Sequence, residues 1–224
     1  MRLVLKFSLA ALIGLAGYLF WPRSSSLSAF DATAMAGLHV SLWRHVADGE
    51  DVPTLFDLYG ILNGQYRLPP LAAMAASAST LQAQNAFAVA ADEADEEKAL
   101  PFLEKSFALL GEKTGTNFDP SIIARLELFT WSLARAPSQE RQLAAAISEK
   151  LALLHGGAAE EYQSTALAFA HARRLAAAKN WSAASDAEAA AWQKLRHHLD
   201  SRSAQQADQR AAEPSAGSSR SSQL

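Results

Sequence analysis

The chain has 224 residues, a formal net charge of −3 and no cysteine. The lack of cysteine excludes disulfides, thiolate metal sites, a cysteine nucleophile and a lipid-modified N-terminal cysteine. A weakly acidic chain without a run of Lys and Arg does not fit a nucleic-acid partner, which normally needs a basic surface. Half of the residues are hydrophobic, which suffices for a packed core, although many are alanines that bury little area.

Residues 1–22 predict a transmembrane anchor. Every residue from Phe7 to Trp21 is apolar or small, and with the apolar residues before it the run reaches about 19 residues, close to the ~20 that a spanning helix needs. Pro22 then ends the helix. The alternatives are a buried helix and a cleaved signal peptide, but the small-x-small triplet at 34–36 lies too far beyond the apolar run for an ordinary cleavage site.

The charges around this segment indicate its orientation. Arg2 and Lys6 precede the apolar run, whereas only Arg23 follows it closely. The positive-inside rule then places the N-terminus in the cytoplasm and the remaining chain across the membrane. Because the alanine-rich composition is typical of a bacterium with GC-rich codons, we expect an inner-membrane protein whose bulk lies in the periplasm.

The rest of the chain predicts an all-α fold. Residues 23–30 form a polar linker, and beyond them apolar residues recur with helical spacing while no stretch alternates as a strand does. Proline at 53 and the Asp119-Pro120 pair are typical of helix starts. Ser138 and Ser182 are further candidate caps. We expect about eight antiparallel helices, at 31–48, 53–66, 70–90, 97–111, 119–136, 138–155, 158–178 and 182–199.

Gly111 to Asn117 (GEKTGTN) contains two glycines with polar neighbours, so we expect a loop at 112–118 that divides these helices into two halves, 31–111 and 119–199. A shift of 88 residues places Leu38 on Leu126 and Trp43 on Trp131, so a duplicated four-helix unit is one interpretation. Residues 200–224 are rich in Ser, Gln and Ala and contain no aromatic residue, which predicts a disordered tail.

Short turns between helices favour stacked antiparallel hairpins, in a solenoid or a bundle. Between Ala166 and Trp192, small residues stand where two helices would cross, and Asn180-Trp181 forms the turn between them. This hairpin resembles the tetratricopeptide repeat, although the glycine and tyrosine positions of that family are missing. The resemblance covers one hairpin and implies helix stacking without implying a particular function.

No group of residues predicts a reaction, a metal site or a cofactor. His39 and His45 lie on different faces of the first expected helix, and no carboxylate stands at metal-ligand spacing, so we expect both at the surface. The acidic run Asp92–Glu97 lacks the glycine of a calcium loop and is expected to be a solvated helix start. The seventh helix directs either Leu175 or Arg173 inward.

A tethered helical stack without catalytic groups predicts an interaction or adaptor protein of the cell envelope, serving a membrane complex through a protein partner. We expect the partner-binding residues among the aromatics Tyr59, Tyr66 and Trp192. The alternative is a helical domain that binds a lipid or small ligand, which requires an enclosed apolar cavity. An enzyme would require convergent polar groups in one cleft. The sequence does not set the oligomeric state.

Overall fold

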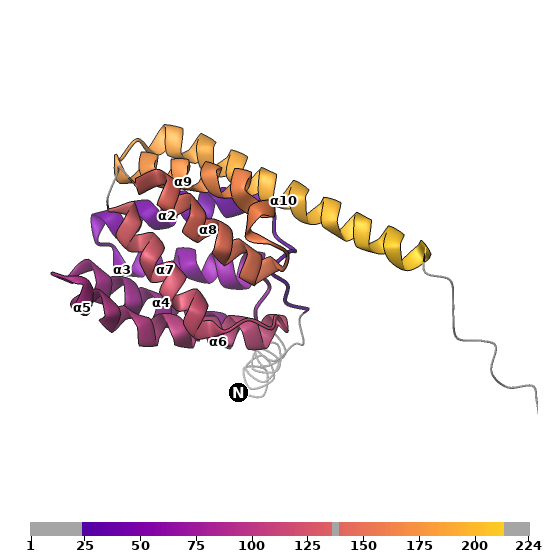
Figure 1. Ribbon diagram of the computed structural model, residues 1–224. Helices are drawn as coiled ribbons and strands as arrows, with labels where there is room; N and C mark the ends of the chain where they lie inside the picture. The colour runs from indigo at the N-terminus through magenta and orange to yellow at the C-terminus, as the bar shows by residue number, and fades with distance from the viewer. Residues whose placement is uncertain (1–23, 136–138, 213–224) are drawn as a thin grey trace, which may run out of the picture.

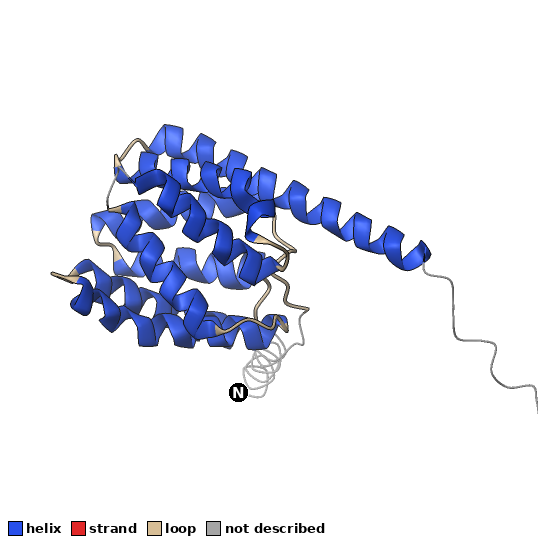
Figure 2. Cartoon of the chain, in the orientation of Figure 1, coloured by secondary structure: helices blue, strands red, loops and turns tan. Residues whose placement is uncertain are grey.

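The computed structural model describes residues 24–135 and 139–212, and within them every regular element is a helix (Figure 2). This confirms the all-α prediction. The predicted anchor at residues 1–22 lies outside the described residues, and none of the helices described is long and apolar enough to cross a bilayer. The eight longer helices are α2 (Ala32–Asp48), α3 (Asp51–Tyr59), α4 (Pro70–Ala88), α6 (Leu100–Thr114), α7 (Pro120–Ala134), α8 (Glu140–His155), α9 (Gln163–Ala177) and α10 (Trp181–Ala212).

Shorter helical segments lie between the longer ones. A π-helix, η1 (Gly60–Gln65), continues α3, and the pair α5 (Glu93–Glu96) and η2 (Glu97–Ala99) leads into α6. The segment η4 (Ala159–Tyr162) leads into α9. Helix α3 begins two residues before the expected proline, which becomes its third residue.

Local sequence signals set several helix starts. The carboxylate of Asp31 accepts a hydrogen bond from the Ala34 backbone N–H at 2.7 Å and caps α2. Asp119 caps α7 in the same way, as expected, with Pro120 in the first turn. The predicted cap Ser138 lies outside the described residues. The predicted cap Ser182 is wrong, because α10 already begins at Trp181 and Asn180 accepts from the Ala183 N–H.

The eight helices pack in a closed order. Each longer helix contacts the next one along the chain, from α2 through to α10, and α10 then packs against α2 (Figure 1). In an open solenoid each unit contacts only its neighbours, so the first and last helices are far apart. The expected tetratricopeptide-like solenoid is therefore wrong, and the bundle that we kept as its alternative describes the arrangement.

Alanines allow the closing helices to approach closely. Ala166, Ala170 and Ala191 are fully buried in the largest core cluster, together with leucines and aromatics from α2, α8, α9 and α10. Trp192 stands at the centre of this cluster, with ring centroids 5.0 Å from Phe30 and 5.1 Å from Phe169. Edge-on aromatic contacts at these distances stabilise by about 1 kcal/mol beyond area burial.

The loop expected at 112–118 begins later than predicted. Helix α6 continues through Gly111 and ends at Thr114. Gly111 is needed for a close approach, because a Cβ there would lie 3.2 Å from the Phe118 ring and 3.3 Å from the Thr116 carbonyl oxygen. The helix expected at 97–111 was predicted to end at this glycine, which instead lies inside α6 and permits close packing.

The tail expected from residue 200 is helical as far as Ala212 and projects beyond the bundle (Figure 1). Arg202 attaches the start of this projecting segment to the bundle. It donates hydrogen bonds to the Gly156 carbonyl oxygen at 2.5 Å and to the Tyr162 hydroxyl at 2.6 Å. Gly157 leaves room for this guanidinium, since a Cβ there would lie 2.9 Å from Arg202 Nη1. Alanine and glutamine beyond it are good helix formers. The prediction of disorder is therefore wrong for residues 200–212.

We expect Arg202→Ala to loosen the projecting part of α10. Its loss removes two charge-assisted hydrogen bonds from a partly exposed site, which lowers the free energy of unfolding by about 1–2 kcal/mol. Amide hydrogen exchange at residues 200–212 then becomes faster. The matched control is Arg210→Ala, an exposed arginine on the same helix. Equal exchange in both variants would contradict the proposed anchoring.

Candidate functional site

Three helices each place a titratable side chain and a tryptophan, four residues apart, toward the interior. The pairs are His39 with Trp43 on α2, Glu127 with Trp131 on α7, and Glu188 with Trp192 on α10. Residues four apart share one face of a helix. In both glutamate pairs the indole Nε1 donates to carboxylate Oε1 at 2.8 Å. His39 and Trp43 make an edge-on ring contact instead, with centroids 6.0 Å apart.

Glu127 lies at the centre of a buried charge cluster between α7, α8 and α9. Lys150 Nζ donates to its Oε2, and Arg173 Nη2 lies 4.0 Å from its Oε1. Arg173 Nη1 also donates to the fully buried hydroxyl of Thr130 at 2.9 Å. Burial acts to raise the pKa of Glu127, but the charges of Lys150 and Arg173 outweigh it and lower that pKa to about 2. Glu127 is therefore ionised throughout the neutral range.

Buried Glu188 and partly buried His39 form a second pair where α10 closes on α2. Glu188 is fully buried, its Oε1 lies 3.4 Å from His39 Nδ1, and its Oε2 has no hydrogen-bond partner. Burial raises the pKa of Glu188 to about 8, against the opposing charges of Arg173 and Lys150. Burial, together with Arg173 and Lys150, lowers the pKa of His39 to about 3. At neutral pH we therefore describe Glu188 as protonated and His39 as neutral.

The two interior carboxyl groups, those of Glu127 and Glu188, differ in their state of ionisation. One is a permanent anion between two cations, and the other is a carboxylic acid beside a neutral imidazole, an arrangement that enzymes use for proton transfer. A general acid must reach its substrate. Glu188 is 0 % exposed, so its carboxyl group is not accessible from solvent in this arrangement of the helices. The Glu127 cluster therefore joins α7, α8 and α9 by ion pairs, whereas Glu188 and His39 place two polar groups side by side where α10 packs on α2.

The predicted partner-binding aromatics lie in or near the interior. Trp192 is 5 % exposed and belongs to the core, so the expectation that it forms a binding surface is wrong. Tyr66 packs against two core clusters, and burial, together with the charge of Glu127, raises its pKa. Tyr59 is half-buried beside the second cluster. Partner binding by the two tyrosines stays a prediction.

His39 was expected at the surface and is instead partly buried, with its ring nitrogen beside the carboxyl group of Glu188. It lies within 5.0 Å of the Trp192 ring and near the Trp43 ring. Of the two inward candidates on the seventh expected helix, Arg173 is the one that reaches the cluster. The repeated spacing of a titratable residue followed four positions later by tryptophan is the sequence signal that could have identified the cluster.

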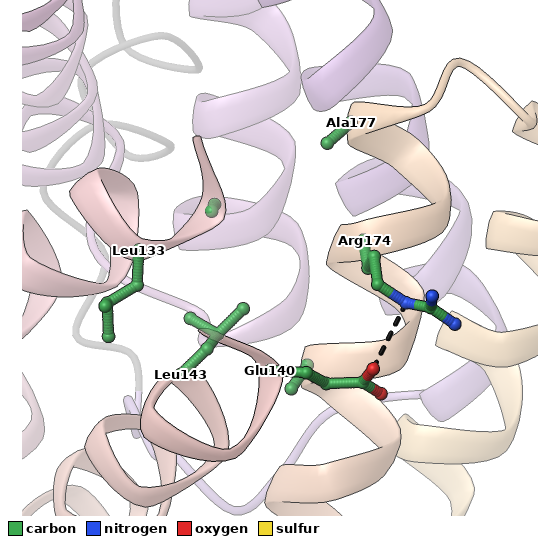
Figure 3. A pocket seen from close by; sticks show the side chains of 7 residues that line it. Leu133, Glu140, Leu143, Arg174 and Ala177 are labelled. Atoms are coloured by element: carbon green, nitrogen blue, oxygen red, sulfur yellow. Dashed lines mark ion pairs between the residues drawn. The ribbon is translucent and has the colours of Figure 1, made fainter. Parts of the chain in front are cut away.

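A small hollow opens between the ends of α7, α8 and α9 (Figure 3). It holds about 20 Å³ of free space, room for roughly one water molecule. Arg174 Nε pairs with Glu140 Oε2 at 3.2 Å across one side. Ligand sites usually measure about 300 Å³ or more, so this hollow is too small for a lipid or metabolite.

Exposed apolar side chains gather at the start of α3. Val52 and Phe56, four residues apart on one face, are 64 % and 62 % exposed. Val89, which caps the end of α4, is 82 % exposed. Asn85, one turn earlier on α4, donates to the Asp51 carboxylate at 3.4 Å and joins the two helix ends. We call Val52, Phe56 and Val89 the distal patch, because it lies at the opposite end of the bundle from Ser24.

Within the described ranges, no three His, Asp or Glu side chains come together as metal ligands. The acidic run forms α5 and η2, with Asp92 as the cap that accepts from the Asp95 N–H at 2.9 Å. The acidic run therefore forms a helix start, as expected. No protein-family model, no curated protein and no solved structure matches the chain.

Glu188→Gln tests the protonation of the closing pair. The raised pKa means that folding takes up a proton between about pH 4.5 and pH 8, so ionisable Glu188 makes the wild type progressively less stable as pH rises through that window. Glutamine removes this dependence. The variant should gain stability relative to wild type, by a few kcal/mol, between about pH 5 and about pH 8.5. Urea unfolding at both pH values measures the difference in stability, with Asp208→Asn on the exposed, projecting part of α10 as control. A difference that is independent of pH would contradict the assignment.

Lys150→Met tests the second part of the cluster. It leaves the Glu127 carboxylate without its closest cation, which should lower the free energy of unfolding by about 3 kcal/mol. The double variant Glu127→Gln, Lys150→Met removes both charges while Trp131 keeps an acceptor, and should recover much of that loss. Chemical denaturation of the two single variants and the double variant measures the coupling. Strictly additive effects would show that the two side chains do not interact.

Proposed function

We propose that the protein is a membrane-tethered helical interaction domain of the cell envelope, acting as an accessory or assembly component of a membrane complex. The observation that carries this proposal is the distal patch. Val52 and Phe56 on one short helix are more than 60 % exposed and Val89 is 82 % exposed, whereas the other exposed large apolar side chains of the described residues, among them Ile122 and Phe129 on α7, are 55 % exposed or less. An exposed apolar cluster of this kind is typical of a protein-binding surface.

The position of the patch fits a tethered protein. The described chain starts beside the turn after η1, where the Ser26 N–H donates to the Tyr66 carbonyl oxygen and Leu27 enters the second core cluster. Helix α2 then runs away from this end for 17 residues, about 25 Å, before α3 begins. If residues 1–22 anchor the chain in the membrane, the distal patch faces away from it.

A photo-crosslinking amino acid at position 52 of the full chain, expressed in its native host, tests this function. We expect a specific adduct with another protein in the membrane fraction, identified by mass spectrometry. The matched control is the same amino acid at position 122, because Ile122 is 49 % exposed on α7, away from the patch. Adducts at both positions alike, or at neither, would contradict the proposal.

Membrane tethering has its own test. The full chain should stay in the membrane pellet after a carbonate wash, because an inserted apolar helix resists extraction. Replacing Ile13 with arginine should release a fraction of the protein, whereas Ile13→Leu should not. A wild-type chain in the washed supernatant would show that residues 1–22 do not anchor it.

A further inference from the structure

Carboxylates surround the distal patch on two sides. Residues 48–57 contain four acidic residues and no Lys or Arg, and residues 92–98 contain five acidic residues and one lysine. Asp48, Glu93 and Glu97 are exposed, and none of them forms an ion pair with another residue of the described ranges 24–135 and 139–212. The only cation among residues 92–98, Lys98, pairs with Asp95. His45 lies 3.7 Å from the carboxylate of Glu50 and 2.8 Å from that of Asp57. The patch is therefore an apolar centre with an acidic rim whose charge is only partly compensated.

The two acidic segments belong to one end of the bundle. The hydrogen bond from Asn85 to Asp51 holds the end of α4 against the start of α3. Arg135 donates to the Phe87 carbonyl oxygen and pairs with Glu96, which holds α5 against the last turn of α4. Val89 lies between these two attachments along the chain. Apolar centre and acidic rim therefore form one surface.

We propose that this surface binds a basic amphipathic segment of a protein partner, with apolar side chains against Val52, Phe56 and Val89 and lysines or arginines against the rim. This proposal rests on the proposed function and adds the chemistry of the partner. An apolar centre with a polar rim is the usual anatomy of a binding interface. Apolar residues at helical spacing fit an amphipathic helix laid along α3.

The negative charge of the rim disfavours three other occupants of this surface: lipid headgroups, nucleic acid and a second copy of the chain. Anionic lipid headgroups and nucleic-acid phosphates are repelled by an acidic surface. A second copy of the chain in a twofold contact would bring the same acidic rim against itself, and facing like charges oppose association. A basic partner is the occupant that gains from both the apolar centre and the rim.

Two synthetic peptides test the proposal on the full chain in neutral lipid nanodiscs. Both form the same amphipathic helix with leucines on one face, and they carry either lysines and arginines or glutamates on the other. Fluorescence anisotropy should show binding of the basic peptide and at least about tenfold weaker binding of the acidic one. Affinity for the basic peptide should fall as NaCl rises from about 0.05 M to about 0.5 M.

Matched variants separate the two parts of the surface. Phe56→Ser should weaken the basic peptide about tenfold or more, whereas Phe129→Ser, which alters a 50 % exposed phenylalanine on α7, should not. Asp48→Asn with Glu93→Gln and Glu97→Gln should weaken binding several-fold and flatten the salt dependence. Glu160→Gln with Asp208→Asn removes exposed carboxylates elsewhere and should leave both unchanged.

Each outcome of these binding and crosslinking experiments either supports or overturns the basic-partner proposal. Equal binding of the two peptides, or unchanged binding by Phe56→Ser or by the neutralised rim, overturns the basic-partner proposal. The proposed function survives such a result if position 52 still forms its specific adduct in native membranes. An adduct that proves to be a second copy of the chain, or a partner segment without basic residues, also overturns it. A crosslinked segment carrying Lys or Arg beside apolar residues supports it.

Discussion

The contact that the whole arrangement depends on is the closure of α10 on α2 around Trp192. Its ring meets Phe30 before α2, His39 on α2 and Phe169 on α9, each with centroids about 5 Å apart. Its indole N–H satisfies one oxygen of Glu188. One side chain therefore joins the first and the last helix of the described chain. The other longer helices pack one after another between these two.

The interior charges help to select one helix alignment in a core whose alanine-rich faces have little relief. Alanine faces pack closely but differ little from one another, so they discriminate weakly between alternative helix alignments. Glu127 between Lys150 and Arg173 requires one relative placement of α7, α8 and α9. Buried ion pairs contribute little net stability compared with apolar residues of the same shape, and their best-attested role is to select one arrangement. We assign that role to this cluster.

Features that depend on neighbouring residues were predictable from the sequence, and features that depend on distant ones were not. Asp119 was recognised as a cap because its partner is two residues away. The anchoring of Arg202 was not, because its acceptors lie 46 and 40 residues earlier in the chain. His39 was placed at the surface because its carboxylate partner comes from the last helix. The tryptophan spacing was visible in the sequence, but only closure gives it meaning.

Both ends of the bundle's chain leave from the same side, and this determines how the fold would respond to mechanical load. The chain enters beside Phe30, while α10 runs antiparallel to α2 and passes Arg196, which donates to the Ser28 carbonyl oxygen at 2.6 Å. A force that separates the N-terminal segment from the projecting arm would peel these two helices apart one contact at a time, beginning at that arginine. The same contacts, pulled along their length, would have to break together. Tension applied between the two ends of the bundle's chain would therefore act in the peeling direction, in which this helix pair is weaker.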